Sequence, residues 1–263
     1  MACEEPLYTI REVSELTGVK PVTLRAWQRR YNLVQPQRTE KGHRLYLSSD
    51  IATIRQIQSW LAKGVSIGKV KPLLMGQQSE EELDQSSELA ECSVLLDALS
   101  KLQRTKAHKI IATVFKEYPL DLVETQFLNP VIETLDHVKG PQRSIQKGLL
   151  QSLMLATLVG IFEAENKVRH KEQCLCINMD SAGSIYAWLW MLKLSGKGVS
   201  ITFLDGIEDL SGLVSEEILD AYSQVGIFSN RSLTSVQYNH IRDIQKNVAG
   251  ECCLSDVLNT LIT

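Results

Sequence analysis

The chain has 263 residues, of which 44% are hydrophobic and 22% are charged, and its formal net charge is −3. An ordinary soluble globular protein has this composition, whereas a fibre, a mostly disordered chain and a disulfide-rich miniprotein do not. The longest apolar stretch, residues 149–162, is shorter than the roughly 20 residues that cross a bilayer, and the N-terminus lacks a signal peptide, so we expect a cytoplasmic protein.

The charge is distributed unevenly along the chain. Residues 1–78 contain 12 Lys and Arg against 6 Asp and Glu, whereas residues 79–263 contain 16 against 25. A basic first third joined to an acidic remainder indicates that the first third binds a polyanion and that the remainder has another task.

Two short helices are predicted near the N-terminus. Thr9 and Glu12 form a capping box for a first helix over residues 10–17, which Gly18 ends. Pro21 suits the first turn of a second, basic helix. The inward face of that helix is expected to carry Leu24, Trp27 and Tyr31. This pattern is typical of a helix-turn-helix, with a helical hairpin that carries solvated arginines as the alternative.

A hairpin is predicted next, over residues 35–46, with Arg38 and Arg44 on its two arms. Ser49 and Asp50 then cap a third helix, whose apolar residues recur at helical spacing. A helix-turn-helix followed by such a hairpin is a winged helix-turn-helix.

The residues that carry a family resemblance stand in order along this first third. They are Tyr8-Thr9-Ile10 with Val13, Thr23-Leu24-Arg25-Ala26-Trp27, Arg29-Arg30-Tyr31, Pro36, Arg38, Gly42, His43-Arg44-Leu45-Tyr46 and Asp50-Ile51. In this pattern the chain resembles the MerR family of bacterial transcription regulators. Residues 21–46 are most similar to the MlrA-like subgroup, in which Ala-Trp stands where other members usually carry two aromatic residues.

The resemblance implies a homodimer that places the second helix of each subunit in the major groove of promoter DNA, with RNA polymerase nearby. By matched position, Pro21, Thr23 and Arg25 would approach base edges. Contacts mainly to phosphate and sugar are implied for Thr9, Trp27, Arg29, Arg38, His43, Arg44 and Tyr46, and Arg30 is counted among the DNA-binding residues. The resemblance also implies activation by distortion of promoter DNA, and control of biofilm or surface-matrix genes.

Arg25 is the expected specificity residue on chemical grounds as well. An arginine can read guanine O6 and N7 through two parallel hydrogen bonds, whereas the other cations and donors mostly neutralise phosphate.

The rest of the chain divides into three predicted parts. Residues 77–88 are acidic and nearly without apolar side chains, which predicts a linker after the DNA-binding domain 1–76. Residues 89–171 repeat apolar residues at helical spacing, which predicts a bundle of helices with breaks near Arg104, Tyr118-Pro119 and Gly140-Pro141. In residues 172–263 short apolar runs alternate with helical patterns, which predicts a small, Rossmann-like parallel α/β domain.

This layout resembles, more weakly, the cobalamin-sensing branch of the same family. Cobalamin binders of this type carry Asp-x-His-x-x-Gly after the first strand, but this chain has no histidine between His170 and His240, and Ser181 lies near that place. The tryptophan that covers the corrin in that branch is missing too, since none lies between Trp60 and Trp188. We therefore expect no cofactor, and a body that forms a dimer or senses a protein partner or an unidentified small molecule.

No catalytic motif and no zinc spacing is found, so we expect neither an enzyme nor a metal site. The six cysteines are expected to be reduced, and the pairs Cys174 and Cys176, and Cys252 and Cys253, to act as small hydrophobic residues. Two alternatives to a DNA-binding regulator remain. One is a cobalamin- or other small-molecule-sensing regulator or corrinoid module. The other is a protein-interaction adaptor, whose affinity for DNA would be low and would depend only weakly on salt.

Overall fold

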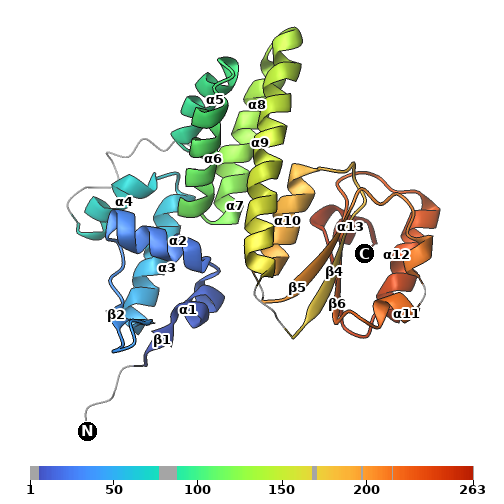
Figure 1. Ribbon diagram of the computed structural model, residues 1–263, viewed down its shortest axis with the longest axis horizontal. Helices are drawn as coiled ribbons and strands as arrows, with labels where there is room; N and C mark the ends of the chain where they lie inside the picture. The colour runs from blue at the N-terminus through green and yellow to red at the C-terminus, as the bar shows by residue number, and fades with distance from the viewer. Residues whose placement is uncertain (1–5, 77–87, 168–170, 197, 215, 263) are drawn as a thin grey trace. The chain divides into compact units, whose positions relative to one another are not determined.

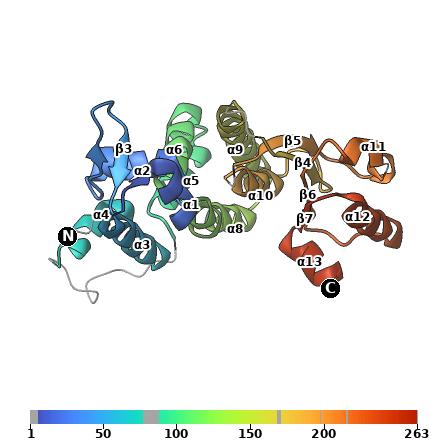
Figure 2. The ribbon, with the colours of Figure 1, turned by 90° about the horizontal axis from the view of Figure 1, so that it is seen from below.

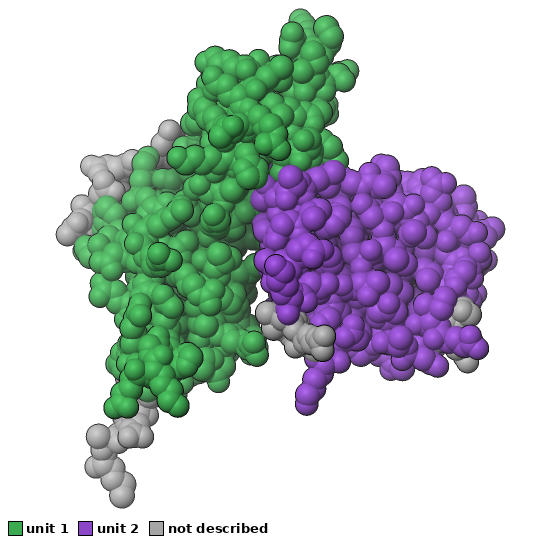
Figure 3. Space-filling view, viewed as in Figure 1, with its two compact units in different colours: residues 1–153 green, residues 154–263 purple. Residues whose placement is uncertain are grey.

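The computed structural model describes residues 6–76, 88–167, 171–196, 198–214 and 216–262, and the chain forms two compact units. The first unit comprises residues 1–153 and the second residues 154–263 (Figure 3). The border between the units lies within one long helix, α9 (Pro141–Asn166). Most of the expected linker lies outside the described residues, and the division into three parts stays a prediction.

A winged helix-turn-helix opens the first unit, as the sequence predicts. Its antiparallel sheet has the strand order β1-β3-β2, with β1 at Tyr8–Thr9, β2 at Gln37–Arg38 and β3 at Arg44–Tyr46. Its helices, shown in blue to teal in Figure 1, are α1 (Ile10–Thr17), α2 (Pro21–Ala26), α3 (Ser48–Ala62) and α4 (Ile67–Leu74). A π-helical turn, η1 (Trp27–Tyr31), extends α2.

The predicted bounds of α1 are confirmed. The Thr9 hydroxyl oxygen accepts a hydrogen bond from the Glu12 backbone N–H at 3.4 Å, and the Thr9 N–H donates to the Glu12 carboxylate at 2.6 Å. Gly18 ends the helix with φ +71°, a conformation that favours glycine. Pro21 occupies the first turn of α2, as expected.

Helix α3 begins earlier than the predicted cap at Ser49 and Asp50. Its first residue is Ser48, and the Asp50 carboxylate accepts the Leu47 backbone N–H at 2.9 Å. The capping role assigned to Ser49 is therefore wrong, because Asp50 satisfies the free backbone donor from within the first helical turn.

A further set of helices completes the first unit, shown in green to yellow-green in Figure 1. They are α5 (Glu91–Ser100), α6 (Arg104–Glu117), the continuous run α7 (Leu120–Leu122), η3 (Val123–Leu128) and α8 (Asn129–His137), and the first half of α9. The predicted breaks are confirmed: Leu102 has φ +51°, Tyr118 is extended before Pro119, and Gly140 has φ +73°.

The second unit contains the predicted parallel α/β fold, with the strand order β5-β4-β6-β7 (Figure 2). The strands are β4 (Gln173–Asn178), β5 (Ser200–Asp205), β6 (Gln224–Phe228) and β7 (Glu251–Leu254). The helical segments are α10 (Ile185–Ser195), η4 (Ser211–Leu213), α11 (Glu216–Leu219), α12 (Ser235–Asn247) and α13 (Asp256–Ile262). Helix α11 is short, and Val214 and Tyr222 on either side of it pack against the core of the unit.

Both faces of this sheet are buried. Leu175, Ile177, Val225 and Ile227 belong to the core cluster that includes Ile241 and Ile244 of α12. The opposite face carries Cys174 and Cys176, whose Sγ atoms are 3.6 Å apart. A side chain at Gly226 would come within 3.0 Å of Leu194 and Trp190, so this glycine allows α10 to pack closely on β6. The expectation that Cys174 and Cys176 are buried is confirmed.

Helix α9 is longer than the sequence predicts. An 18-residue window within it has a mean hydropathy of 1.4 and is 28% buried, so its length and composition would suffice to cross a membrane. The apolar stretch of residues 149–162 lies inside this helix, which continues through polar residues on both sides of it. Core helices of soluble proteins meet the same criterion, and Leu150, Leu153 and Leu158 of α9 are buried.

Candidate nucleic-acid interface

The β2–β3 hairpin places two arginines opposite each other. Arg38 and Arg44 are direct partners in the antiparallel register, although like charges across a strand pair destabilise a sheet. The hairpin is closed by a turn in which the Gly42 N–H donates to the Thr39 carbonyl at 2.8 Å and Gly42 has φ +80°. The hairpin therefore presents two positive charges side by side, as an anion-binding surface would.

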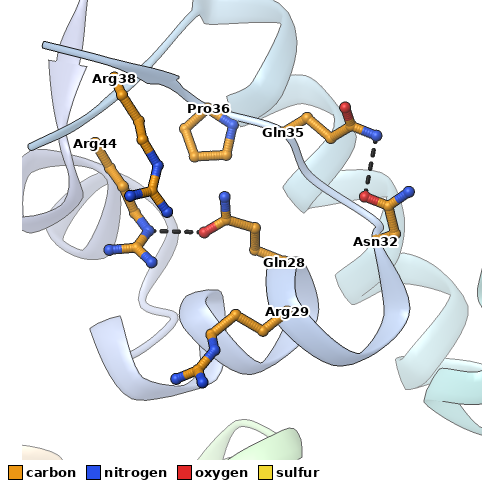
Figure 4. A pocket seen from close by; sticks show the side chains of 7 residues that line it. All are labelled: Gln28, Arg29, Asn32, Gln35, Pro36, Arg38 and Arg44. Atoms are coloured by element: carbon orange, nitrogen blue, oxygen red, sulfur yellow. Dashed lines mark hydrogen bonds between the residues drawn. The ribbon is translucent and has the colours of Figure 1, made fainter. Parts of the chain in front are cut away.

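A third arginine joins them from the neighbouring helix. Arg29 of η1, together with Arg38 and Arg44, lines a surface pocket of about 520 Å³, which we call the arginine pocket. Its seven lining residues are Gln28, Arg29, Asn32, Gln35, Pro36, Arg38 and Arg44, none of which is acidic (Figure 4). The three arginines form no ion pair with any carboxylate in the part of the chain that the structure describes.

Hydrogen bonds between side chains shape the arginine pocket. The Arg44 Nε donates to the Gln28 Oε1 at 2.7 Å, which ties the hairpin to the helix. The Gln35 Nε2 donates to the Asn32 Oδ1 at 3.0 Å, and in Figure 4 the side chains of Arg38 and Arg44 lie next to each other. Three arginines around a concave surface without an acid are chemically suited to phosphate, which a guanidinium group binds through paired N–H donors.

The helix formed by α2 and η1 has two different sides. Val22, Arg25 and Arg29 are exposed, and their spacing of three and four residues places them along one side. Leu24 and Trp27 are buried on the inner side. Val22 is 44% exposed on this side, and it was not identified as a candidate from the sequence.

The structure separates the predicted DNA-binding residues into surface and core. Thr9, Arg25, Arg29, Arg38 and His43 are exposed, and Pro21 and Arg44 are half-buried. Thr23 and Trp27 are almost fully buried and pack in the core, so the DNA contacts that the resemblance implies for them stay predictions. The Tyr46 ring is also buried, but its hydroxyl has no hydrogen-bond partner among the described residues, so its DNA contact stays a prediction.

Arg30 points away from the arginine pocket. Its Nη1 donates to the carboxylate of Glu117 on α6, and the Tyr31 hydroxyl donates to the same carboxylate at 2.6 Å. The Trp27 Nε1 donates to the Glu117 backbone carbonyl at 2.7 Å. Burial, together with the hydrogen bond to Glu117, raises the pKa of Tyr31, so its phenol remains a donor. Sequence spacing gives no sign of contacts between residues so far apart.

The carboxyl edge of the second unit's sheet was the other candidate site, and its polar groups bond to one another. Asp205 accepts from the Asn178 Nδ2 at 2.7 Å, from the Gly183 N–H at 2.9 Å and from the Trp188 Nε1 at 3.3 Å. Asp180 accepts from the Ser229 hydroxyl at 2.9 Å. These internal hydrogen bonds occupy both carboxylates that a ligand would use.

The same edge does not fit a cobalamin. Ser181, which lies near the place of the cobalt-binding histidine, is exposed and supplies only a hydroxyl. Trp188 packs edge-on against Phe162 and Phe203, with ring centroids 5.9 Å and 4.8 Å away. Among residues 6–76, 88–167, 171–196, 198–214 and 216–262, no group of three His, Cys, Asp or Glu side chains could hold a metal ion.

Comparison with known proteins points to one family. The family model described as "MerR HTH family regulatory protein" matches residues 8–77. The "HTH-type transcriptional regulator MlrA" of Salmonella typhimurium (strain LT2) and that of Escherichia coli (strain K12) are each 32% identical over 200 residues, covering 74% of this chain and 79% of theirs. The "HTH-type transcriptional repressor CarH" of Myxococcus xanthus is 27% identical over 216 residues, covering 76% of this chain and 71% of its own.

Proposed function

The chain belongs to the MerR family of helix-turn-helix regulators and is a DNA-binding transcriptional regulator similar to MlrA; from this premise we propose that it binds promoter DNA as a homodimer and activates transcription by distorting that DNA. In each subunit α2 and η1 enter the major groove, while the β2–β3 hairpin lies over the adjoining phosphates. The observation that carries the proposal is the arginine pocket, in which helix and hairpin together gather three arginines and no acid.

Different residues contact the bases and the phosphates in this proposal. Arg25 and Val22 lie on the exposed side of the second helix, where arginine can bond guanine and an apolar side chain can touch a thymine methyl. Arg29, Arg38 and Arg44 form the phosphate site, and exposed His43 lies at the end of the hairpin turn. Thr9 remains an exposed candidate at the cap of α1.

The affinity for duplex DNA is expected to fall steeply as salt rises. Three arginines per subunit make about six phosphate contacts per dimer, which predicts a log–log slope of about −5 and a loss of about 10³-fold between 50 and 200 mM salt. Fluorescence anisotropy of labelled duplexes with the full chain measures this slope. A flat dependence would instead favour the protein-interaction adaptor.

Arg44→Ala is expected to weaken binding to the operator and to random DNA equally, by about tenfold, and to make the salt slope shallower by about 2 per dimer. The reason is that this residue binds phosphate, which every sequence presents. Arg104→Ala, which removes an exposed arginine from α6, is the matched control and should leave both affinities unchanged. A loss confined to the operator would assign Arg44 to base reading.

Activation by distortion predicts bent DNA in the complex. If the operator is placed at different positions in fragments of equal length, the complexes should migrate differently in a gel, most slowly with the operator at the centre. Equal mobility of all complexes would contradict the distortion mechanism while leaving DNA binding intact.

The second unit has the proposed task of sensing. The carboxylates at the carboxyl ends of its parallel strands bond to neighbouring groups of the chain, which argues against a cofactor site there. We therefore propose that this unit binds a protein partner or an unidentified effector in the cytoplasm. The resemblance of residues 21–46 to the MlrA-like subgroup supports biofilm or surface-matrix genes as targets. Genome-wide mapping of the bound promoters tests that assignment.

A further inference from the structure

Glu117 is a buried carboxylate that lies outside the helix and hairpin of the proposed DNA interface. It ends α6 and is only 3% exposed. Its three donors, Trp27, Arg30 and Tyr31, all come from η1, the five-residue π-helical turn that continues α2. One residue of α6 thus binds most of the polar groups that η1 turns inward.

The contacts with Glu117 and the exposed DNA-reading residues lie on opposite sides of the same short helix. Arg30 and Tyr31 follow Trp27 by three and four residues, and all three donate to Glu117 at the end of α6. Arg25 and Arg29, also four residues apart, are exposed on the other side. Because the helix has only eleven residues, a rotation or shift at α6 moves the reading side by a similar amount.

A buried carboxylate makes this attachment sensitive to small displacements. Glu117 has lost its hydration, and among the described residues its carboxylate accepts hydrogen bonds from Arg30 and Tyr31, which stabilise its charge. Other bonds hold α3 and α4 to the neighbouring helices: the Gln126 Nε2 donates to the Leu61 carbonyl of α3 at 3.1 Å, and the Ile67 N–H of α4 donates to the Tyr118 hydroxyl at 3.4 Å. Removal of the Glu117 charge should therefore loosen the second helix while α3 and α4 stay attached.

We propose that Glu117 is a positioning residue for DNA recognition: by binding Arg30 and Tyr31 it fixes the orientation of the second helix and thereby sets how strongly the chain prefers its operator to random DNA. This inference rests on the proposed DNA-binding function. It assigns Arg30 to Glu117 rather than to phosphate, and it makes α6 the element through which the rest of the first unit affects DNA reading.

The test compares variants of the full chain on an operator selected from random DNA with the wild-type protein. Glu117→Gln keeps the backbone carbonyl that Trp27 uses and removes the charge that Arg30 and Tyr31 bind. It should lower the operator-to-random affinity ratio about tenfold, with the affinity for random DNA nearly unchanged. Glu133→Gln, at an exposed carboxylate of α8, is the control and should keep the wild-type ratio.

A double-mutant cycle separates positioning from a general loss of stability. Arg30→Gln should lower the ratio as Glu117→Gln does, and the double variant should lose no more than either single one, because both break the same attachment. An unchanged ratio in folded Glu117→Gln, or additive losses, would overturn the inference. If Glu117→Gln does not fold, the same affinity ratio is measured for Tyr31→Phe, which removes one donor to the Glu117 carboxylate. A fall of the ratio by about threefold would support the inference, and an unchanged ratio would overturn it. If the wild-type chain binds no DNA, the proposed function itself fails.

Discussion

Trp27→Ala is expected to lower the free energy of unfolding of the first unit by about 3–5 kcal/mol. The indole is fully buried, and its Nε1 donates to the Glu117 carbonyl at 2.7 Å. The change therefore opens a large cavity and leaves a buried carbonyl without its donor. The unfolding is measured by hydrogen exchange in increasing urea. Mass spectrometry of peptides from residues 8–76 then reports the first unit separately from the second.

Trp60→Ala is the matched control for this result. Trp60 is half-buried, and the Lys63 Nζ lies 4.5 Å from its ring centroid, so its replacement should cost about 1 kcal/mol. Equal losses for the two variants would show that Trp27 has no special place in the core. A large loss for Trp27→Ala alone would confirm that the tryptophan expected at the DNA surface serves the fold.

Arg25→Ala is expected to weaken binding to the selected operator by about 1–3 kcal/mol, or about 5- to 150-fold, and to change the affinity for random DNA little. Arg25 is exposed on the side of the second helix that also carries Val22 and Arg29. A bidentate bond from its guanidinium to one guanine would be lost only where that guanine is present. Competition binding with operators substituted at each position should locate the base whose identity no longer matters.

Arg25→Lys separates the effect of charge from that of geometry. Lysine keeps the charge but lacks the planar pair of donors, so random-DNA affinity should be retained while the preference for the operator falls. Equal losses on operator and random DNA for Arg25→Ala would assign Arg25 to phosphate binding.

Local signals predicted the elements well. The Thr9 capping box, Gly18 and Pro21 set the bounds of α1 and α2, because caps and turns depend on neighbouring residues. The alternation of strand and helix after residue 172 was also sufficient to predict a parallel sheet. Helix α13 and the two-residue strand β1 were not predicted, since a segment that short gains its structure from what it packs against.

The candidate site was predicted only in part. Arg25, Arg29, Arg38 and Arg44 lie at the surface, as expected from residue type and motif position. The pairing of Arg30 with Glu117 could not be read from the sequence, because it depends on the π-helical turn and on a helix more than 80 residues away. Motif spacing locates a residue on a helix but does not reveal which neighbour it meets.

The bond from Trp27 to the Glu117 carbonyl also bears on protein engineering. A fragment cut at the end of the family motif would leave its central tryptophan without the acceptor that α6 provides. Grafts that transplant this reading head onto another body should therefore carry the chain at least through Tyr118, one residue past that acceptor.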